Sequence, residues 1–88
     1  MVIEIYTSSL CGYCLLAKKI LTKNNIPFIE TNLDKQPNKE AEMKKRSGGI
    51  TSVPQIFFSG SHIGGYNELS LLERNSGLEY FSKQISLS

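Results

Sequence analysis

The residues best suited to chemistry are Cys11 and Cys14, the only two cysteines of the chain. They form a Cys-Gly-Tyr-Cys motif that follows a predicted strand and opens a predicted helix. Cys11 would then lie near the helix N-cap, where unpaired N–H groups and the positive end of the helix dipole favour a thiolate. Cysteine pKa values fall well below about 8.5 at such positions, and the thiolate is the attacking species in disulfide exchange. Cys14 lies one turn further on the same face, so we interpret Cys11 as the nucleophile and Cys14 as the resolving thiol.

Three other interpretations of the pair are weaker. A structural disulfide would close a loop with only two residues between the cysteines, which gains little from the loss of chain entropy. A structural zinc site usually needs four ligands, and the only histidine, His62, lies in a distant hairpin. A chance pair of buried cysteines is the last alternative. A C-x-x-C pair inside a strand–helix–strand pattern is typical of redox proteins, so we expect no bound metal.

The elements around the cysteines form a strand–helix–strand unit. Residues 2–6 alternate and are rich in β-forming residues, which predicts a strand. Apolar residues at helical spacing follow the cysteines, and Asn24-Asn25 ends this helix. A second strand is predicted over residues 27–33, beginning at a proline. This order favours a right-handed parallel unit.

The second half of the chain predicts further elements that complete an α/β fold. These are a polar helix between Asp34 and Gly48, strands at 55–58 and 62–63, a helix N-capped by Asn67, and a helix over 78–85. We therefore predict a thioredoxin-like fold, with a central four-stranded mixed β-sheet flanked by helices on both faces. The length of 88 residues predicts one domain.

Two further segments could form part of a site. Val53-Pro54 lies just before a strand, where a trans bond is the default and a cis bond would expose the Val53 main chain to an extended peptide. The residues alone leave this choice open. Gly65 and Tyr66 precede a helix, where backbone N–H groups could bind an anion or simply form a turn. Tyr13 either packs on the helix or shapes a substrate groove.

The composition excludes several other functions. The net charge of +2 and the absence of a dense basic run argue against nucleic-acid binding. No segment approaches the ~20 apolar residues that cross a membrane, and the N-terminus lacks the pattern of a signal peptide. We therefore expect a cytoplasmic protein with no membrane association. Ordinary cysteines are kept reduced in that compartment, which favours a catalytic pair.

Taken together, these motifs resemble the short bacterial dithiol form of the glutaredoxin family. The matching segments are Glu4-Ile5-Tyr6-Thr7, Cys11-Gly12-Tyr13-Cys14, Lys45-Arg46-Ser47-Gly48, Ser52-Val53-Pro54-Gln55-Ile56-Phe57 and His62-Ile63-Gly64-Gly65. They keep the family's order and spacing apart from about one extra residue near Gly49-Ile50, and they cover essentially the whole chain. The resemblance thus implies a single glutaredoxin domain over residues 1–88.

The resemblance also implies a partner and a reaction. The Val53–Pro54 bond should be cis, the Val53 backbone should pair with the cysteinyl part of glutathione, and N–H groups around Tyr66 and Asn67 should hold the γ-glutamyl carboxylate. The expected glutathione-binding residues are Tyr13, Ser52, Val53, Pro54, Gly65, Tyr66 and Asn67. A monomer would use glutathione as its reductant and co-substrate. Its clients would be proteins that contain disulfides or are glutathionylated.

Three departures from the family pattern modify this expectation. Ser8 stands three residues before Cys11, where the family often has a lysine that binds the glycyl carboxylate, and Asn67 replaces the usual aspartate. We hypothesise weaker glutathione binding on this basis. Gly12 replaces the commoner proline. A small residue at this position resembles the pattern of dimeric glutaredoxins that carry a [2Fe–2S] cluster, and Cys11 would then be the cluster ligand. The retained Cys14 favours the enzyme over this alternative. A thioredoxin-type reductant is disfavoured by Tyr13 and the short chain.

Overall fold

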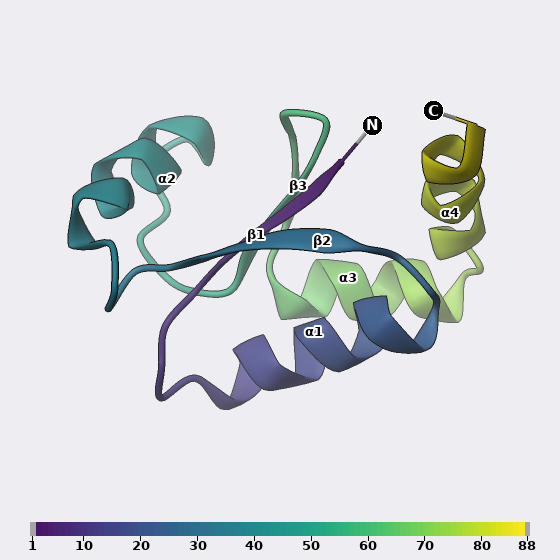
Figure 1. Cartoon of the computed structure of the whole chain (residues 1–88), viewed down its shortest axis with the longest axis horizontal. Coiled ribbons are helices and arrows are strands. Elements are labelled where there is room, and N and C mark those ends of the chain that lie inside the picture. Colours follow the sequence, from purple (N-terminus) through teal and green to yellow (C-terminus); the bar gives the residue numbers. More distant parts are fainter. Residues whose placement is uncertain (1, 88) are drawn as a thin grey trace.

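The structure is a computed structural model and describes residues 2–87, so Met1 and Ser88 of the predicted domain lie outside the described residues. A four-stranded mixed sheet has the order β2-β1-β3-β4 (Figure 1). Its strands are β1 (Ile3–Thr7), β2 (Phe28–Asn32), β3 (Gln55–Phe58) and β4 (Ser61–Gly64). β1 pairs in parallel with β2, while β3 is antiparallel to both β1 and β4. The predicted parallel unit and mixed sheet are confirmed.

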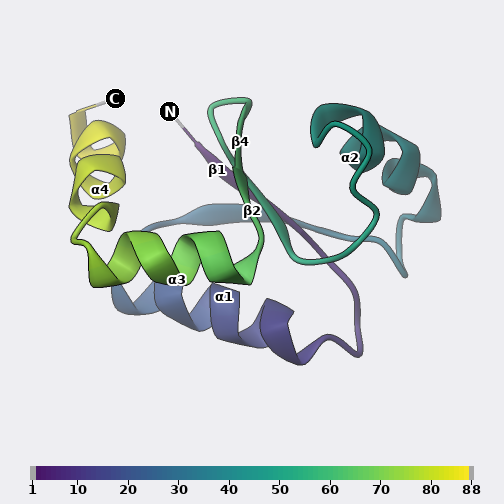
Figure 2. The same ribbon diagram turned by 180° about the vertical axis from the view of Figure 1, so that it is seen from behind.

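Helices cover both faces of this sheet. They are α1 (Gly12–Lys23), the short 3₁₀ helix η1 (Pro37–Lys39), α2 (Glu40–Arg46), α3 (Tyr66–Arg74) and α4 (Leu78–Leu87). α1 and α3 pack side by side on one face, while α2 lies apart from them across the sheet (Figures 1 and 2). Within residues 2–87, every helix is too short or too polar to cross a membrane. This arrangement confirms the predicted thioredoxin-like fold.

The larger core lies between the sheet and the α1–α3 face. Ile3 and Ile5 alternate along β1 and point into this core, because successive side chains of a strand point to opposite faces. Leu21 from α1 and Leu69 from α3 are fully buried against them. α4 adds Leu78 to the same core. This packing holds α1, and with it the cysteine pair, rigidly on the sheet.

A smaller core attaches α2 to the opposite face. Met43 is the only buried residue of α2, as expected of a polar helix. Tyr6 and Phe57 pack against Met43, and the Arg46 guanidinium lies 4.3 Å from the Phe57 ring centroid. Arg46 also donates to both carboxylate oxygens of Glu4, at 2.9 and 3.1 Å. A charged network therefore supplements a short apolar contact.

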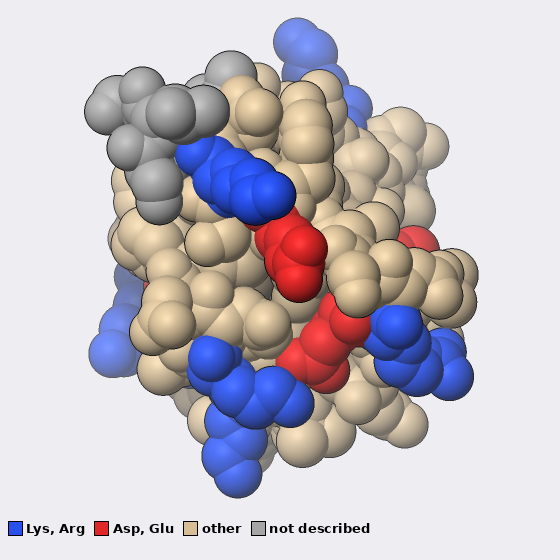
Figure 3. Space-filling view, turned by 90° about the vertical axis from the view of Figure 1, so that its right-hand side faces the viewer, with Lys and Arg blue, Asp and Glu red and all other residues tan. Residues whose placement is uncertain are grey.

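Surface charges are dispersed on the face seen in Figure 3. There, lysine and arginine side chains lie apart from one another, with acidic side chains between several of them. Lys23 pairs with Glu73 at 3.2 Å, and Glu73 also accepts from Asn24 at 2.9 Å. These contacts link the end of α1 to α3. They pull the pKa of the Glu73 carboxyl below its ordinary range, the Asn24 hydrogen bond having the largest effect.

Several predicted boundaries differ from the structure, and the ends of β1, β2 and α4 differ by one or two residues. The predicted helix between residues 34 and 48 is η1 followed by the shorter α2. β4 runs from Ser61 to Gly64 and is longer at both ends than the predicted strand at 62–63. The predicted N-cap at Asn67 is wrong, because the N-cap of α3 is Gly65. Glu68 reaches back so that its Oε1 accepts from the Gly65 N–H at 2.7 Å, and this contact starts the helix two residues earlier.

Candidate active site

Cys11 lies at the N-cap of α1, as the sequence predicts, and a disulfide joins it to Cys14 with the two Cα atoms 5.2 Å apart. The Cys14 backbone N–H donates to the Cys11 Sγ at 3.0 Å. This N–H is one of the helix-start donors that have no partner within the helix, and it is aimed at the sulfur. The geometry therefore suits a thiolate at Cys11 after reduction.

The two cysteines differ in exposure. Cys11 is partly exposed, whereas only 1% of Cys14 is exposed. A bulky substrate can reach the outer sulfur but not the inner one. Disulfide exchange depends on such access as well as on the thiolate fraction. The structure thus separates a reachable sulfur from an enclosed one.

The loop before β3 brings the Val53 main chain beside Cys11. The Val53–Pro54 bond is cis, which confirms what the family resemblance implies, and Pro54 is buried. The Cys11 Sγ lies 3.8 Å from the Val53 carbonyl oxygen. Within the described residues, the Val53 N–H has no hydrogen-bond partner. An extended ligand could therefore pair with this segment while its sulfur faces Cys11.

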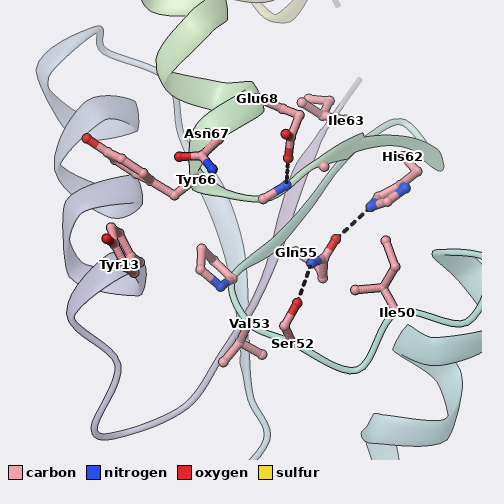
Figure 4. A pocket seen from close by; sticks show the side chains of 13 residues that line it. Tyr13, Ile50, Ser52, Val53, Gln55, His62, Ile63, Tyr66, Asn67 and Glu68 are labelled. Atoms are coloured by element: carbon pink, nitrogen blue, oxygen red, sulfur yellow. Dashed lines mark hydrogen bonds between the residues drawn. The ribbon is translucent and has the colours of Figure 1, made fainter.

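A groove of about 580 Å³ runs past this loop to the start of α3 (Figure 4). Every residue predicted to contact glutathione lines it. These residues are Tyr13, Ser52, Val53, Pro54, Gly65, Tyr66 and Asn67. The Tyr13 and Tyr66 rings lie 5.3 Å apart between centroids and form one wall. Segments far apart in the sequence therefore meet in one groove beside the redox pair.

The two glycines before α3 allow this groove to close around the helix start. Gly64 has φ of +131°, and a Cβ there would come within 2.6 Å of Glu68 Oε1. A Cβ on Gly65 would lie 3.2 Å from the Pro54 carbonyl oxygen. Both positions therefore favour glycine, one for its backbone conformation and one for close packing. Tyr66, Asn67 and Glu68, the first residues of α3, line this end of the groove.

Gln55 and His62 also line the groove, although the sequence analysis assigned neither to it. The Gln55 Oε1 lies 2.7 Å from His62 Nε2, and the His62 ring packs 4.9 Å from the Phe57 ring. Gln55 is only 4% exposed. A buried polar residue at the start of an apolar strand was the signal that could have revealed it.

Charge in the groove is sparse. Among the described residues that line it, none is a lysine or an arginine, and Glu68 is the only carboxylate. The Ser8 position supplies no cation, as the sequence indicates. In residues 2–87, no three His, Cys, Asp or Glu side chains gather closely enough to hold a metal ion. The described lining of the groove therefore offers neutral donors and shape rather than positive charge.

A charged cluster lies behind the cysteine loop. Glu30 accepts from the Thr7 hydroxyl at 2.7 Å and pairs with Lys18 at 3.0 Å. The Thr7 hydrogen bond, helped by Lys18, holds the pKa of the Glu30 carboxyl below its ordinary range against the opposing effect of burial. Thr7 ends β1 and Lys18 lies on α1, so the cluster joins the two elements that flank Cys11.

An N-cap disulfide beside a cis-proline loop, carried on a thioredoxin-like sheet, defines a thiol–disulfide oxidoreductase. The glutaredoxin family model matches residues 3–63. Glutaredoxin 3 of Escherichia coli strain K12 is 44% identical over 77 residues, which cover 88% of this chain and 92% of that protein. The chain belongs to the glutaredoxin family.

Other relatives agree with this assignment. A glutaredoxin of Pseudomonas aeruginosa is 38% identical over 77 residues, which cover 88% of this chain and 90% of that protein. The solution structure of glutaredoxin from Brucella melitensis has a TM-score of 0.76 and 38% identity, covering 91% of this chain and 86% of that one. The similarity thus extends over sequence and fold together.

Proposed function

We propose that this glutaredoxin depends on glutathione and reduces both protein disulfides and glutathione mixed disulfides. The position of the Cys11 Sγ carries the proposal, because the atom lies 3.8 Å from the Val53 carbonyl oxygen, beside the groove. At about 580 Å³, the groove falls within the usual size of small-molecule sites. Glutathione is a tripeptide-like thiol, so a peptide-binding edge next to a reactive sulfur fits its chemistry.

Glutathione would lie along the groove with its sulfur toward Cys11. Its cysteinyl main chain would pair with the Val53 backbone, between Pro54 and the Tyr13 ring. Its γ-glutamyl carboxylate would accept from the N–H groups of Tyr66 and Asn67 at the start of α3. Ser52 and Gly65 would complete the contact surface. A similar protein supports this placement: the buckwheat glutaredoxin–glutathione complex is 25% identical with a TM-score of 0.75, covering 84% of this chain and 69% of that one.

Mixed disulfides would need only the outer cysteine. The Cys11 thiolate attacks the glutathione sulfur, a bond forms between the two sulfurs, and the client leaves as a thiolate that takes up a proton. A second glutathione thiolate then attacks the glutathione sulfur held on Cys11. Glutathione disulfide leaves, and the Cys11 thiolate is restored. The N–H of Cys14 stabilises the anionic sulfur at both ends of this cycle.

Protein disulfides would need both cysteines. The Cys11 thiolate attacks one client sulfur and releases the other as a thiolate. The Cys14 thiolate then attacks Cys11 Sγ, which releases the reduced client and forms the Cys11–Cys14 disulfide present in the structure. Two glutathione molecules reduce this disulfide and become glutathione disulfide. The electrons thus pass from glutathione to the client.

A coupled assay of the two cysteine variants tests this function. Cys11→Ser should be inactive on every substrate, because no other sulfur reaches the groove. Cys14→Ser should keep activity on glutathionylated peptides and lose it on protein disulfides. Equal activity of Cys11→Ser and the unmodified protein would contradict the proposal.

Residues 1–88 would act as one monomeric domain in the cytoplasm, where glutathione is abundant and reducing. The [2Fe–2S] alternative rests on Gly12, where a Cβ would meet no atom within 4 Å. The glycine is therefore not required by a close contact in this conformation. We propose the enzyme alone. Size-exclusion chromatography of the protein purified with glutathione tests this assignment, and a colourless monomer is the expected result.

A further inference from the structure

The groove has to recognise a negatively charged ligand with few charges of its own. Glutathione carries a carboxylate at each end, and the proposed function places one of them at the start of α3. No described lining residue there is a lysine or arginine, and the nearby Glu68 is itself negative. Neutral N–H donors must therefore bind the carboxylate in place of a lysine or arginine side chain.

The side chain of Gln55 offers such a donor. Its Nε2 lies 3.5 Å from Ser52 Oγ, a contact drawn as a dashed line in Figure 4. The same atom is 3.8 Å from the position that a Cβ would take on Gly65. It thus lies close to Gly65, the N-cap of α3. The side chain is 96% buried by its surroundings, with its 4% exposure at the groove.

The orientation of this amide depends on His62. A carboxamide has an acceptor at one end and a donor at the other, and rotation by half a turn exchanges them. Gln55 Oε1 lies 2.7 Å from His62 Nε2, which donates to it in this orientation. If the amide rotated, the carbonyl oxygen would face the groove and repel a carboxylate. When Nε2 carries the ring proton, the His62 contact therefore selects the orientation that presents Gln55 Nε2 to the groove.

His62 is itself held in place although its side chain is exposed. Its ring lies 4.9 Å from the Phe57 ring at an interplanar angle of 32°. Phe57 is fully buried, and Arg46 lies 4.3 Å from its ring centroid. A rigid aromatic support thus fixes the imidazole against Gln55.

We propose that Gln55 Nε2 donates to the glutathione carboxylate at the start of α3, and that His62 is the positioning residue that holds the amide in this orientation. This inference rests on the proposed function and adds a specificity determinant to it. It predicts discrimination between glutathione and small thiols that lack a carboxylate. The chemistry at Cys11 should be independent of both residues.

The test uses one peptide carrying either glutathione or 2-mercaptoethanol in a mixed disulfide. Reduced protein releases the peptide thiol in a single turnover, so glutathione enters only as part of the substrate. The variant His62→Phe keeps a ring against Phe57 but removes the N–H donor. Ser61→Ala, an exposed neighbour in β4 that does not line the groove, is the matched control.

For His62→Phe we expect the half-saturating concentration of the glutathione substrate to rise about tenfold, the usual effect of losing a hydrogen bond to a charged group. The maximal rate, and all constants for the 2-mercaptoethanol substrate, should stay unchanged. Gln55→Glu should give the same pattern more strongly, because a carboxylate repels the ligand. Ser61→Ala should match the unmodified protein.

Two results would overturn the inference. If His62→Phe left the glutathione substrate unaffected, or impaired both substrates equally, His62 would have only a structural role. Thermal unfolding of His62→Phe shows whether the fold is retained, and the exposed position makes the variant tolerable. If the unmodified protein itself failed to distinguish the two substrates, the proposed glutathione dependence would fall, and this inference with it.

Discussion

At the scale of single residues, the two cysteines differ in exposure and in hydrogen bonding. Cys11 is partly exposed and receives the Cys14 N–H, while Cys14 is enclosed beneath it. In the proposed mechanism, the same residue type therefore serves as the attacking group at position 11 and as the internal reductant one helical turn later. Single substitutions near the pair, at Ser8 and Glu30, test how charge affects glutathione binding and stability.

Ser8→Lys should improve the binding of glutathione mixed disulfides. Ser8 lies in the loop between β1 and α1, and the groove holds no basic residue among those described. An added ammonium should lower KM about two- to fivefold, the range expected of an exposed ion pair. Steady-state assays against Ser8→Gln, which has similar length without charge, isolate the electrostatic effect. An unchanged KM in Ser8→Lys would refute the hypothesis of weakened binding.

Glu30→Gln should reduce stability in a pH-dependent way. The pKa of the Glu30 carboxyl is lowered in the folded protein, mainly by the Thr7 hydroxyl, with Lys18 assisting. Its contribution is therefore present above the unfolded pKa of about 4.3 and is lost as pH falls through the lower folded value. The variant should be less stable by about 1 kcal/mol at pH 7, and the difference should vanish at acidic pH.

Urea unfolding of the two proteins at a series of pH values measures this difference. Glu40→Gln, which removes an exposed carboxylate from the start of α2, is the control. A destabilisation by Glu30→Gln that is the same at every pH would show that packing, and not charge, explains the loss.

At the scale of the elements, the first turn of α1 determines how the redox pair is presented. Gly12 is the first helical residue, and it follows Cys11 in an extended conformation with φ of −123° and ψ of 104°. Glycine makes this turn less rigid in the unfolded chain than other residues would. The helix otherwise gains its rigidity from buried contacts on the sheet.

Gly12→Pro should stabilise the protein by about 0.4–1 kcal/mol. Proline suits the first helical position, and the extended Cys11 satisfies the restriction on the residue before proline. A Cβ at this position meets no atom within 4 Å. Urea unfolding of the reduced proteins, with Gly12→Ala as the comparison, checks the effect. A less stable Gly12→Pro would contradict this account of the turn.

At the scale of the whole molecule, local patterns predicted most of the fold. Alternation identified β1, and helical spacing identified α1, because each buries a regular face in the larger core. The start of α3 was mispredicted for a local reason: Glu68 caps Gly65 from inside the helix, and nothing in Asn67 reveals this. Element order and type depend on periodic burial, whereas boundaries depend on single side-chain contacts.

The site was predictable only in part. The spacing of Cys11 and Cys14 was enough to predict a redox pair at the start of a helix. The cis bond at Val53–Pro54 could not be predicted from the residues alone, because trans is the default. Only the family resemblance implied it. Gln55 and His62 escaped because their contact joins two strands through the β3–β4 hairpin. Tertiary pairing of this kind leaves no periodic pattern in the sequence.

The central claim is that Cys11 alone carries glutathione, and intact-mass spectrometry of two reduced variants tests it most directly. Each variant is mixed with glutathione disulfide, and the modified residue is located by peptide mapping. Cys14→Ser should gain a single glutathionyl group on Cys11, while Cys11→Ser should stay unmodified over the same period because Cys14 is only 1% exposed. Equally fast modification of Cys14 in Cys11→Ser would contradict the account.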